Sequence, residues 1–294
     1  MKTICGCLLW LLPLTSYTQS SSTGYIREEA AQAEAGFSTQ RFSSIATLQQ
    51  VAALAPNETL LQRDMQTFRT LERSAAPQVH TVYALRYFQS FGKRSLLSFN
   101  VGLISRSLMV AQNSYEATTL SVLDDYRNEQ GTKFDLYRYT TEYISYQINS
   151  ALMQLPLGLQ ISGNKRRRVW AQAGIEIAPG RLYNARYVIY QNITESTDLH
   201  KPNSSEPATG PEQENFPDRD ATAQSRNYLF LNGYTFTAGL PLTLYFNITR
   251  RAPASGKLLV LINAQPYYMF TKFATLQSRQ GFELMLSTGI RYRL

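Results

Sequence analysis

Apolar and polar residues alternate through the end of the chain, Gly281–Leu294, with few exceptions. A period of two predicts a β-strand with one apolar face and one polar face. Earlier segments follow the same pattern, and each is long enough to cross a bilayer, which takes about 9–11 tilted residues. The series predicts an all-β fold, an antiparallel transmembrane β-barrel in which lipid-facing apolar residues alternate with polar residues of the lumen. The earlier segments are Val79–Gln89, Leu96–Met109, Tyr146–Ile161, Val169–Ala178, Asn227–Phe246 and Lys257–Phe270, the last less regular because Leu259 and Leu261 fall on its polar face.

Seven strands are visible in this pattern, whereas bacterial single-chain barrels usually have an even number. We therefore expect a barrel of about eight strands, and Phe37–Thr47 is the segment that best fits an additional strand before Val79. Much of the region around it has helical spacing, and Asn57 is placed to cap a helix. The predicted organisation is a signal peptide at residues 1–18, an N-terminal segment at 19–78 and a barrel at 79–294. The N-terminal segment has either one weak strand with helical stretches or a helical plug.

The beginning of the chain predicts secretion. Lys2 precedes an apolar stretch, Ile4–Leu14, and small residues follow it, as in a secretory signal peptide. The only two cysteines, Cys5 and Cys7, lie in this stretch, so the secreted chain would have no disulfide and no cysteine-ligated metal. The 19 tyrosines and 14 phenylalanines fit the aromatic girdles of a barrel. Because the signal leads out of the cytosol, the formal net charge of +8 does not indicate a nucleic-acid partner.

The connections between the predicted strands differ in length and charge. Three short ones, Ser90–Ser95, Ser162–Arg168 and Asn247–Gly256, are basic, and we read the cluster Lys165–Arg168 as a solvated turn rather than a site for anionic headgroups. Two long ones, Val110–Thr141 and Arg181–Arg226, are acidic. Outer-membrane barrels have short periplasmic turns and longer external loops. We therefore expect a protein of the bacterial outer membrane, with its C-terminus and short basic turns in the periplasm and its long acidic loops outside.

A Leu-Pro-Leu sequence occurs twice, at Leu155–Leu157 and Leu240–Leu242, and each copy leads through a strand into a basic turn. Proline interrupts a central strand, so the repeat predicts a bulge or bend near the periplasmic rim. Together with the signal peptide, the glycine-containing strand Ala171–Ala178 and the terminal strand ending Gly289–Leu294, this chain resembles small bacterial outer-membrane barrels of the PorT-like type. The resemblance implies a barrel whose last strand is recognised by the assembly machinery, and it brings no catalytic motif.

The residues that carry chemistry give little support for catalysis. His200 follows Asp198 in a long acidic loop, but the adjacent segment Lys201–Pro217 has the composition of a solvated, disordered loop. His80 begins a strand, and no spacing assigns it a serine partner. The acidic loops lack the Asp-x-Asp-x-Asp-Gly spacing of a calcium loop. We therefore expect no enzyme activity, no cofactor and no metal.

The lumen-facing row is the main candidate site. An eight-stranded barrel has an interior that side chains just fill. The charges on the polar faces are therefore predicted to pair with one another in a closed core, and the alternative is that they line a narrow polar channel. The predicted network consists of Arg86, Glu176, Glu283 and Arg291.

The pattern favours a non-enzymatic outer-membrane protein with a structural, surface-interaction or envelope-assembly role. A small pore or transport barrel for ions or small solutes is the main alternative, and an outer-membrane enzyme is a minor one. A soluble β-sandwich or lipocalin-like binder is the alternative fold, but it would need polar outer faces. Expected partners are outer-membrane lipid and lipopolysaccharide, the barrel assembly machinery through the C-terminal strand, and an envelope protein. The pattern leaves the ligand and the oligomeric state open.

Overall fold

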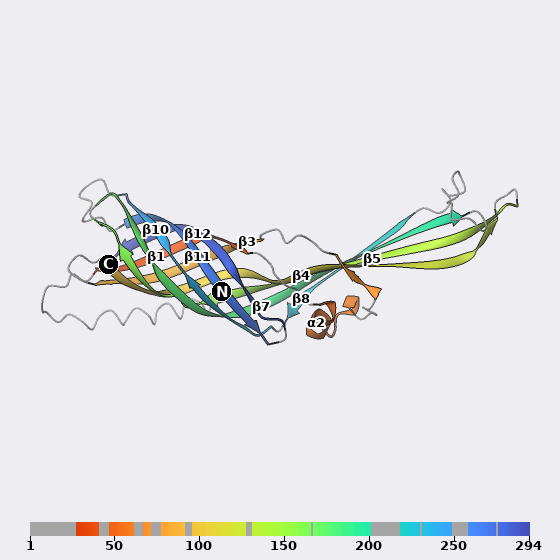
Figure 1. Cartoon of the computed structure of the whole chain (residues 1–294), viewed down its shortest axis with the longest axis horizontal. Helices are drawn as coiled ribbons and strands as arrows, with labels where there is room; N and C mark the ends of the chain where they lie inside the picture. Colours follow the sequence, from red (N-terminus) through yellow and green to blue (C-terminus); the bar gives the residue numbers. More distant parts are fainter. Residues whose placement is uncertain are drawn as a thin grey trace.

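The computed structural model describes residues 28–40, 47–61, 67–71, 78–91, 96–127, 131–165, 167–200, 218–229, 231–248, 258–274 and 276–294 (Figure 1). The predicted signal peptide at residues 1–18 and the acidic segment Lys201–Pro217 lie outside these residues. None of the helices within the described ranges is long and apolar enough to cross a membrane.

A ring of eight hydrogen-bonded antiparallel strands forms a closed barrel. The ring closes where β1 pairs with both β3 and β12. Two of its positions are built from consecutive pieces, β5 with β6, and β9 with β10. The strands are β1 (Glu28–Gln40), β3 (Gln78–Phe91), β4 (Leu97–Arg127), β5 (Lys133–Gln154), β6 (Leu157–Ser162), β7 (Val169–His200), β8 (Arg219–Leu229), β9 (Gly233–Gly239), β10 (Leu242–Asn247), β11 (Leu258–Phe273) and β12 (Arg279–Arg293).

The prediction for the first strand was misplaced. Strand β1 occupies Glu28–Gln40, so it shares only four residues with the predicted Phe37–Thr47. Its inward residues include Gln32 and Glu34, but much of its outward row is alanine, which gives a weak apolar alternation. Because β1 belongs to the ring, part of the barrel wall comes from the segment 19–78.

Helical structure in this segment is short. Helix α2 (Leu48–Leu54) begins at Thr47, whose hydroxyl accepts a hydrogen bond from the Gln50 amide in a capping box. A 3₁₀ turn, η2 (Thr59–Leu61), follows, and the two-residue strand β2 (Arg69–Thr70) pairs with β4. The helical spacing in the sequence therefore corresponds only in part to helix, namely to α2, and Thr47, which we assigned to a strand, is its N-cap. Asn57 caps no α-helix in the described residues, where only the turn η2 follows it.

Both Leu-Pro-Leu sequences lie where a barrel strand is interrupted. The break between β5 and β6 contains Pro156, and the break between β9 and β10 contains Pro241. The carbonyl of each proline still accepts a hydrogen bond from a glycine of the neighbouring strand, at 3.2 Å in both cases. The strand register is the same on both sides of each break, so the predicted bulge is absent and each proline only interrupts the strand while the wall stays closed.

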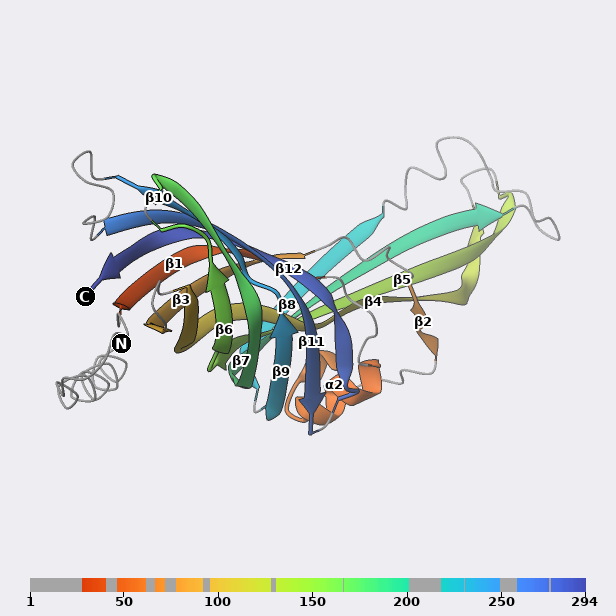
Figure 2. The ribbon, with the colours of Figure 1, turned by 60° about the vertical axis from the view of Figure 1, so that its left-hand side comes forward.

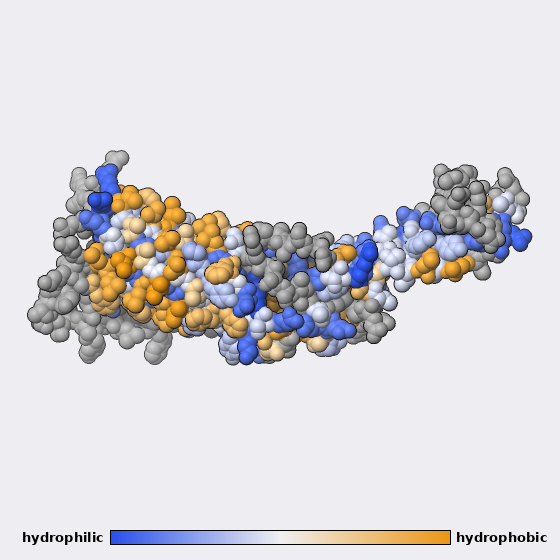
Figure 3. All heavy atoms as spheres, in the orientation of Figure 1, coloured by the Kyte–Doolittle hydropathy of each residue, from blue (hydrophilic) through white to orange (hydrophobic). Residues whose placement is uncertain are grey.

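Large apolar side chains form a belt around the outside of the barrel, and Figure 3 shows part of this belt at the end away from the arm described below. The inward residues of the same strands are polar and buried, for example Gln160 and Thr243. This apolar-out, polar-in arrangement is that of a transmembrane barrel, and it is the reverse of a soluble lipocalin-like binder. The belt includes Leu97, Phe99, Val101, Leu157, Leu159, Leu242, Leu244, Phe282, Leu284 and Ile290.

The two long connections are largely β-sheet, so their prediction as loops was wrong. Strand β3 pairs with β4 only as far as Arg106, but β4 continues to Arg127. Beyond the barrel, the sheet continues as an antiparallel extension of β4, β5, β7 and β8, which we call the arm (residues 107–127, 133–149, 185–200 and 219–229). About 20 residues of β4 lie in the arm, which is roughly 65–70 Å of strand at about 3.3 Å per residue. Figures 1 and 2 show the arm extending from one end of the barrel.

The base of the arm packs against helix α2. Val51 and Leu61 join a buried apolar cluster with Ile144, Tyr146 and Ile189 of the arm. Helix α2 therefore lies against the base of the arm, where the arm leaves the barrel (Figure 2).

Candidate functional site

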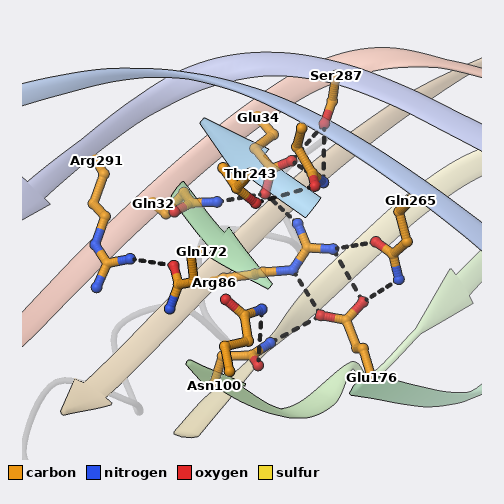
Figure 4. Close-up of polar contacts among 12 residues, drawn as sticks. Gln32, Glu34, Arg86, Asn100, Gln172, Glu176, Thr243, Gln265, Ser287 and Arg291 are labelled. Atoms are coloured by element: carbon orange, nitrogen blue, oxygen red, sulfur yellow. Dashed lines mark hydrogen bonds and ion pairs between the residues drawn. The ribbon is translucent and has the colours of Figure 1, made fainter. Parts of the chain in front are cut away.

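An ion cluster crosses the middle of the lumen. Arg86 of β3 donates from Nε and Nη2 to the two carboxylate oxygens of Glu176 on β7, both at 3.1 Å, and from Nη1 to Glu34 of β1 (Figure 4). The side chains of Arg86, Glu34 and Glu176 are only 2 %, 1 % and 1 % exposed. Three separate strands are thus joined through one guanidinium group.

Neutral side chains complete the bonding of both carboxylates. Asn100 and Gln265 each donate to Glu176 at 2.9 Å. Glu34 accepts hydrogen bonds from Gln32 at 2.7 Å, Asn263 at 3.1 Å and Ser287 at 2.5 Å. Each carboxylate oxygen therefore has a donor, which is the condition under which buried charges are tolerated.

A second cluster surrounds Glu283 on β12. Its carboxylate lies 3.4 Å from Arg279 and 3.9 Å from Arg106, and it accepts a hydrogen bond from the Tyr267 hydroxyl at 2.6 Å. The guanidinium of Arg106 also lies 4.8 Å from the centre of the Tyr267 ring. The side chains of all three charged residues are at most 6 % exposed.

Aromatic and aliphatic groups close the lumen at the end that carries the short turns. Arg291 is fully buried, with its guanidinium carbon 4.2 Å from the centre of the Phe88 ring. It donates to the Tyr245 hydroxyl at 3.0 Å, and Tyr245 stacks on Trp170 with ring centres 4.0 Å apart. Leu259 and Leu261, which broke the polar row in the sequence, pack here against Trp170 and Tyr245.

The structure divides the predicted network among these clusters. Arg86 and Glu176 bind each other, whereas Glu283 and Arg291 belong to separate groups. Sequence reasoning missed the other charged partners, although Glu34 and Arg106 both lie on the polar row of their strands. The missed residues are Glu34, Arg106 and Arg279.

The histidines do not form a complete catalytic set among the described residues. His80 Nδ1 lies 3.4 Å from the Ser107 hydroxyl, but its Nε2 has no hydrogen-bond partner, so no carboxylate orients the ring. His200 does not lie in a loop as predicted: it ends β7, opposite Asp135, and meets the Tyr137 ring edge-on at 4.9 Å. No group of three or more metal-ligating side chains occurs in the described part of the chain.

Glu58, in the segment that follows α2, forms hydrogen bonds with the arm. Its carboxylate accepts hydrogen bonds from the Tyr187 hydroxyl at 2.9 Å, the Ser225 hydroxyl and the Leu60 amide. Burial raises the pKa of Glu58, but the hydrogen bonds from Ser225, Leu60 and Tyr187 outweigh burial and hold the pKa below its ordinary value. The anionic form of Glu58 is therefore the form that the contact stabilises.

The arm has two open sheet edges among the described residues. Strand β8 pairs only with β7, and β4 beyond Glu116 pairs only with β5. On the β4 edge, Leu120 and Val122 are 55 % and 70 % exposed. An exposed edge strand with apolar side chains is a template for another strand.

The turn between β6 and β7 is not the fully solvated turn that we predicted. The Lys165 side chain is only 9 % exposed; its ammonium lies 3.0 Å from Glu28 and donates to Ser90 at 3.2 Å. Burial lowers the pKa of Lys165, the nearby cations Arg291 and Arg293 lower it too, and Glu28 only partly opposes them. Arg293 shares the same carboxylate, at 3.0 Å.

Comparisons with known proteins give no family. No protein-family model and no curated protein matches the chain. Among solved structures, Ail of Yersinia pestis is 10% identical with a TM-score of 0.25, over 90% of this chain and 99% of that chain. Neisserial surface protein A is 10% identical with a TM-score of 0.30, and the match covers 94% of this chain and 100% of that chain. The outer membrane protease OmpT from Escherichia coli is 6% identical with a TM-score of 0.18, and the match covers 94% of this chain and 99% of that chain. At these scores the matches carry no argument beyond the fold that the chain itself displays.

Proposed function

We propose that this protein is a non-enzymatic outer-membrane barrel that presents its arm for interaction at the cell surface. The observation that carries the proposal is the arm itself, which extends β4, β5, β7 and β8 beyond the barrel. The barrel then serves as the membrane anchor and the arm as the binding part.

The packed lumen supports an anchor rather than a pore. The clusters around Arg86, Glu283 and Arg291 bury their charged side chains and bond them to one another or to neighbouring polar groups. A pore would instead keep such charges in contact with water along a continuous path. The incomplete environment of His80 likewise favours a non-enzymatic role.

The open edges of the arm suggest how a partner would bind. An extended segment of another protein can add to a sheet edge through main-chain hydrogen bonds, while side-chain contacts give specificity. The β4 edge around Leu120 and Val122 is the better candidate because both residues are exposed. In this proposal the arm is outside the cell and the short basic turns are in the periplasm. The PorT-like resemblance, lipopolysaccharide contacts and recognition of the last strand by the assembly machinery stay predictions.

Location and orientation are tested with single cysteines in a chain whose Cys5 and Cys7 are replaced by alanine. The wild-type protein should fractionate with the outer membrane and migrate faster on a detergent gel unboiled than boiled. Val122→Cys on the arm should react with an impermeant thiol reagent on intact cells, whereas Asn164→Cys in the short turn should react only after lysis. Recovery as a soluble protein would refute the membrane location, and the opposite labelling pattern would refute the orientation.

The binding role is tested with a photocrosslinking amino acid at Val122 on intact cells. It should give discrete protein adducts, whereas the same amino acid at the outward-facing Phe282 of the belt should not. Replacing Leu120 and Ser121 by lysine in the same chain should abolish the adducts, because charges on an edge strand oppose strand addition. Unchanged adducts in the lysine variant, or no protein adducts at all from Val122, would contradict a docking edge.

A further inference from the structure

The end of the barrel that carries the short turns has a large excess of positive charge. The connections 92–95, 163–168 and 248–257 contain no acidic residue, and their basic residues are Lys93, Arg94, Lys165, Arg166, Arg167, Arg168, Arg250, Arg251 and Lys257. Arg291 and Arg293 of β12 add to this charge from the adjacent strand end. The acidic residues that begin β1, Glu28 and Glu29, are too few to balance it.

The contacts at this end leave cationic donors unmatched. Glu28 is shared by Lys165 and Arg293, each 3.0 Å away, so one carboxylate faces two cations. Arg293 Nη2 has no hydrogen-bond partner among the described residues, and neither do Nε and Nη2 of the buried Arg291. These two arginines therefore add positive charge at this end that the described carboxylates do not balance.

The exposed cations of the turn are held at a fixed place by its backbone. The Arg167 amide donates to the Asn164 carbonyl at 3.1 Å, and the Asn247 amide donates to the Arg168 carbonyl at 2.9 Å. Both arginine side chains are exposed. The next residue, Val169, is 49 % exposed and begins the outward apolar row of β7. The cations therefore lie at the edge of the apolar belt, at the height where a lipid carries its headgroup.

We propose that this end of the barrel binds the headgroup phosphate of anionic phospholipids in the leaflet that it faces. The basic rim, which we define as the exposed Arg167 and Arg168, supplies the cations that contact the headgroup, and the apolar belt beside Val169 supplies the surface for the acyl chains. Lys165 and Arg293 lie behind the rim, where they share Glu28 and add to the positive potential. Guanidinium groups suit this ligand because they bind phosphate oxygens through paired hydrogen bonds. The inference rests on the proposed location in a membrane.

Trp170 provides a reporter next to the site. The chain has two tryptophans, and Trp10→Phe leaves only Trp170, whose ring lies 5.8 Å from the Lys165 ammonium. The full chain with this substitution is refolded into phosphatidylcholine vesicles that contain increasing fractions of phosphatidylglycerol with brominated acyl chains. Quenching of Trp170 by brominated phosphatidylglycerol, compared with brominated phosphatidylcholine, gives the relative affinity for the anionic lipid.

The expected result is preferential quenching by phosphatidylglycerol that depends on the basic rim. A cation near an anionic surface strengthens binding roughly fivefold, so Arg167→Gln with Arg168→Gln should lower the relative affinity by up to about 25-fold, towards parity. Arg219→Gln with Arg226→Gln removes the same charge from exposed positions on the arm and should leave the preference unchanged.

Each other outcome overturns a stated part of the inference. Equal quenching by both lipids, or equal losses in both double variants, would refute a specific site on the basic rim. A preference abolished by millimolar inorganic phosphate would assign the rim to free phosphate rather than to lipid. Failure to insert, seen as identical mobility of boiled and unboiled samples, would instead refute the membrane location proposed above.

Discussion

Removing the guanidinium at the centre of the lumen should destabilise the barrel strongly. Arg86→Met leaves Glu34 and Glu176 as two buried carboxylates with no cation between them. At an effective dielectric constant of about 20, a pair of unit charges about 4 Å apart interacts by about 4 kcal/mol, and Arg86 makes two such pairs. Desolvation of Arg86 offsets part of this gain, so the free energy of unfolding should fall by about 3–5 kcal/mol, as measured when one partner of a buried pair is removed.

The matched control removes all three charges of the cluster together. Arg86→Met combined with Glu34→Gln and Glu176→Gln has no buried charge in this cluster, and it should recover most of the lost stability. Both variants are refolded into vesicles, and unfolding in guanidinium chloride is followed by the gel mobility shift. A loss below about 1 kcal/mol for Arg86→Met, without recovery in the triple variant, would mean that water solvates the cluster and that the closed-lumen argument is wrong.

Three further predictions address the other charged cluster, the belt and the α2 segment. Glu283→Gln should lower the stability of the barrel because Arg279 and Arg106 lose their shared carboxylate. The wild-type barrel should show no steady ion current in a planar bilayer, and a current whose ion selectivity changes in Glu283→Gln would favour a pore. Leu157→Arg in the belt should lower the free energy of unfolding by about 2–4 kcal/mol if the residue lies at the bilayer midplane. In the same refolding titration, Val122→Arg on the exposed arm should leave the free energy of unfolding almost unchanged, and equal losses in both variants would refute the assignment of the belt. Since the pKa of Glu58 is lowered, its hydrogen bonds are complete above the ordinary carboxyl pKa, about 4.3, and are lost as the pH falls through the lowered value. The thiol of Val51→Cys should therefore be labelled faster in acid, relative to an exposed Val122→Cys control, and Glu58→Gln should abolish this pH dependence. A pH dependence that persists in Glu58→Gln would exclude Glu58 as its origin.

The strands that face lipid were predictable because the surroundings impose a strict alternation. Leu157 and Leu159 face the outside of the barrel and Gln160 faces its buried polar interior, so a period of two is required. Strand β1 was harder to place because much of its outward row is alanine, for example Ala31 and Ala35, whose small side chains give little contrast with their polar neighbours.

The strands of the arm were predicted as loops for a different physical reason. Where both faces of a sheet contact water, no face has to be apolar, and segments such as Thr118–Ser121 show little period-two pattern. Strand propensity remained as a signal, since threonine and tyrosine recur along β4 and β5, but we read polarity and length as evidence for loops.

The polar rows identified which charges face the lumen but not which of them meet. Arg86 and Glu176 pair because the register of separate strands brings them to one height, and register cannot be read from either strand alone. The separation of Glu283 and Arg291 was predictable, because eight residues on one strand span about 26 Å.

The continuity of β4 and β7 has a mechanical consequence. Each runs as one strand, of 31 and 32 residues, from the barrel wall into the arm, with no loop between the two parts. The arm is therefore a rigid extension of the barrel wall and is not joined to it by a flexible linker. A partner bound near its tip meets a surface that is already ordered, so little conformational entropy is lost on binding. A sideways force on that partner would reach the hydrogen-bonded barrel wall as torque, and the packed interior of the barrel would resist the resulting deformation.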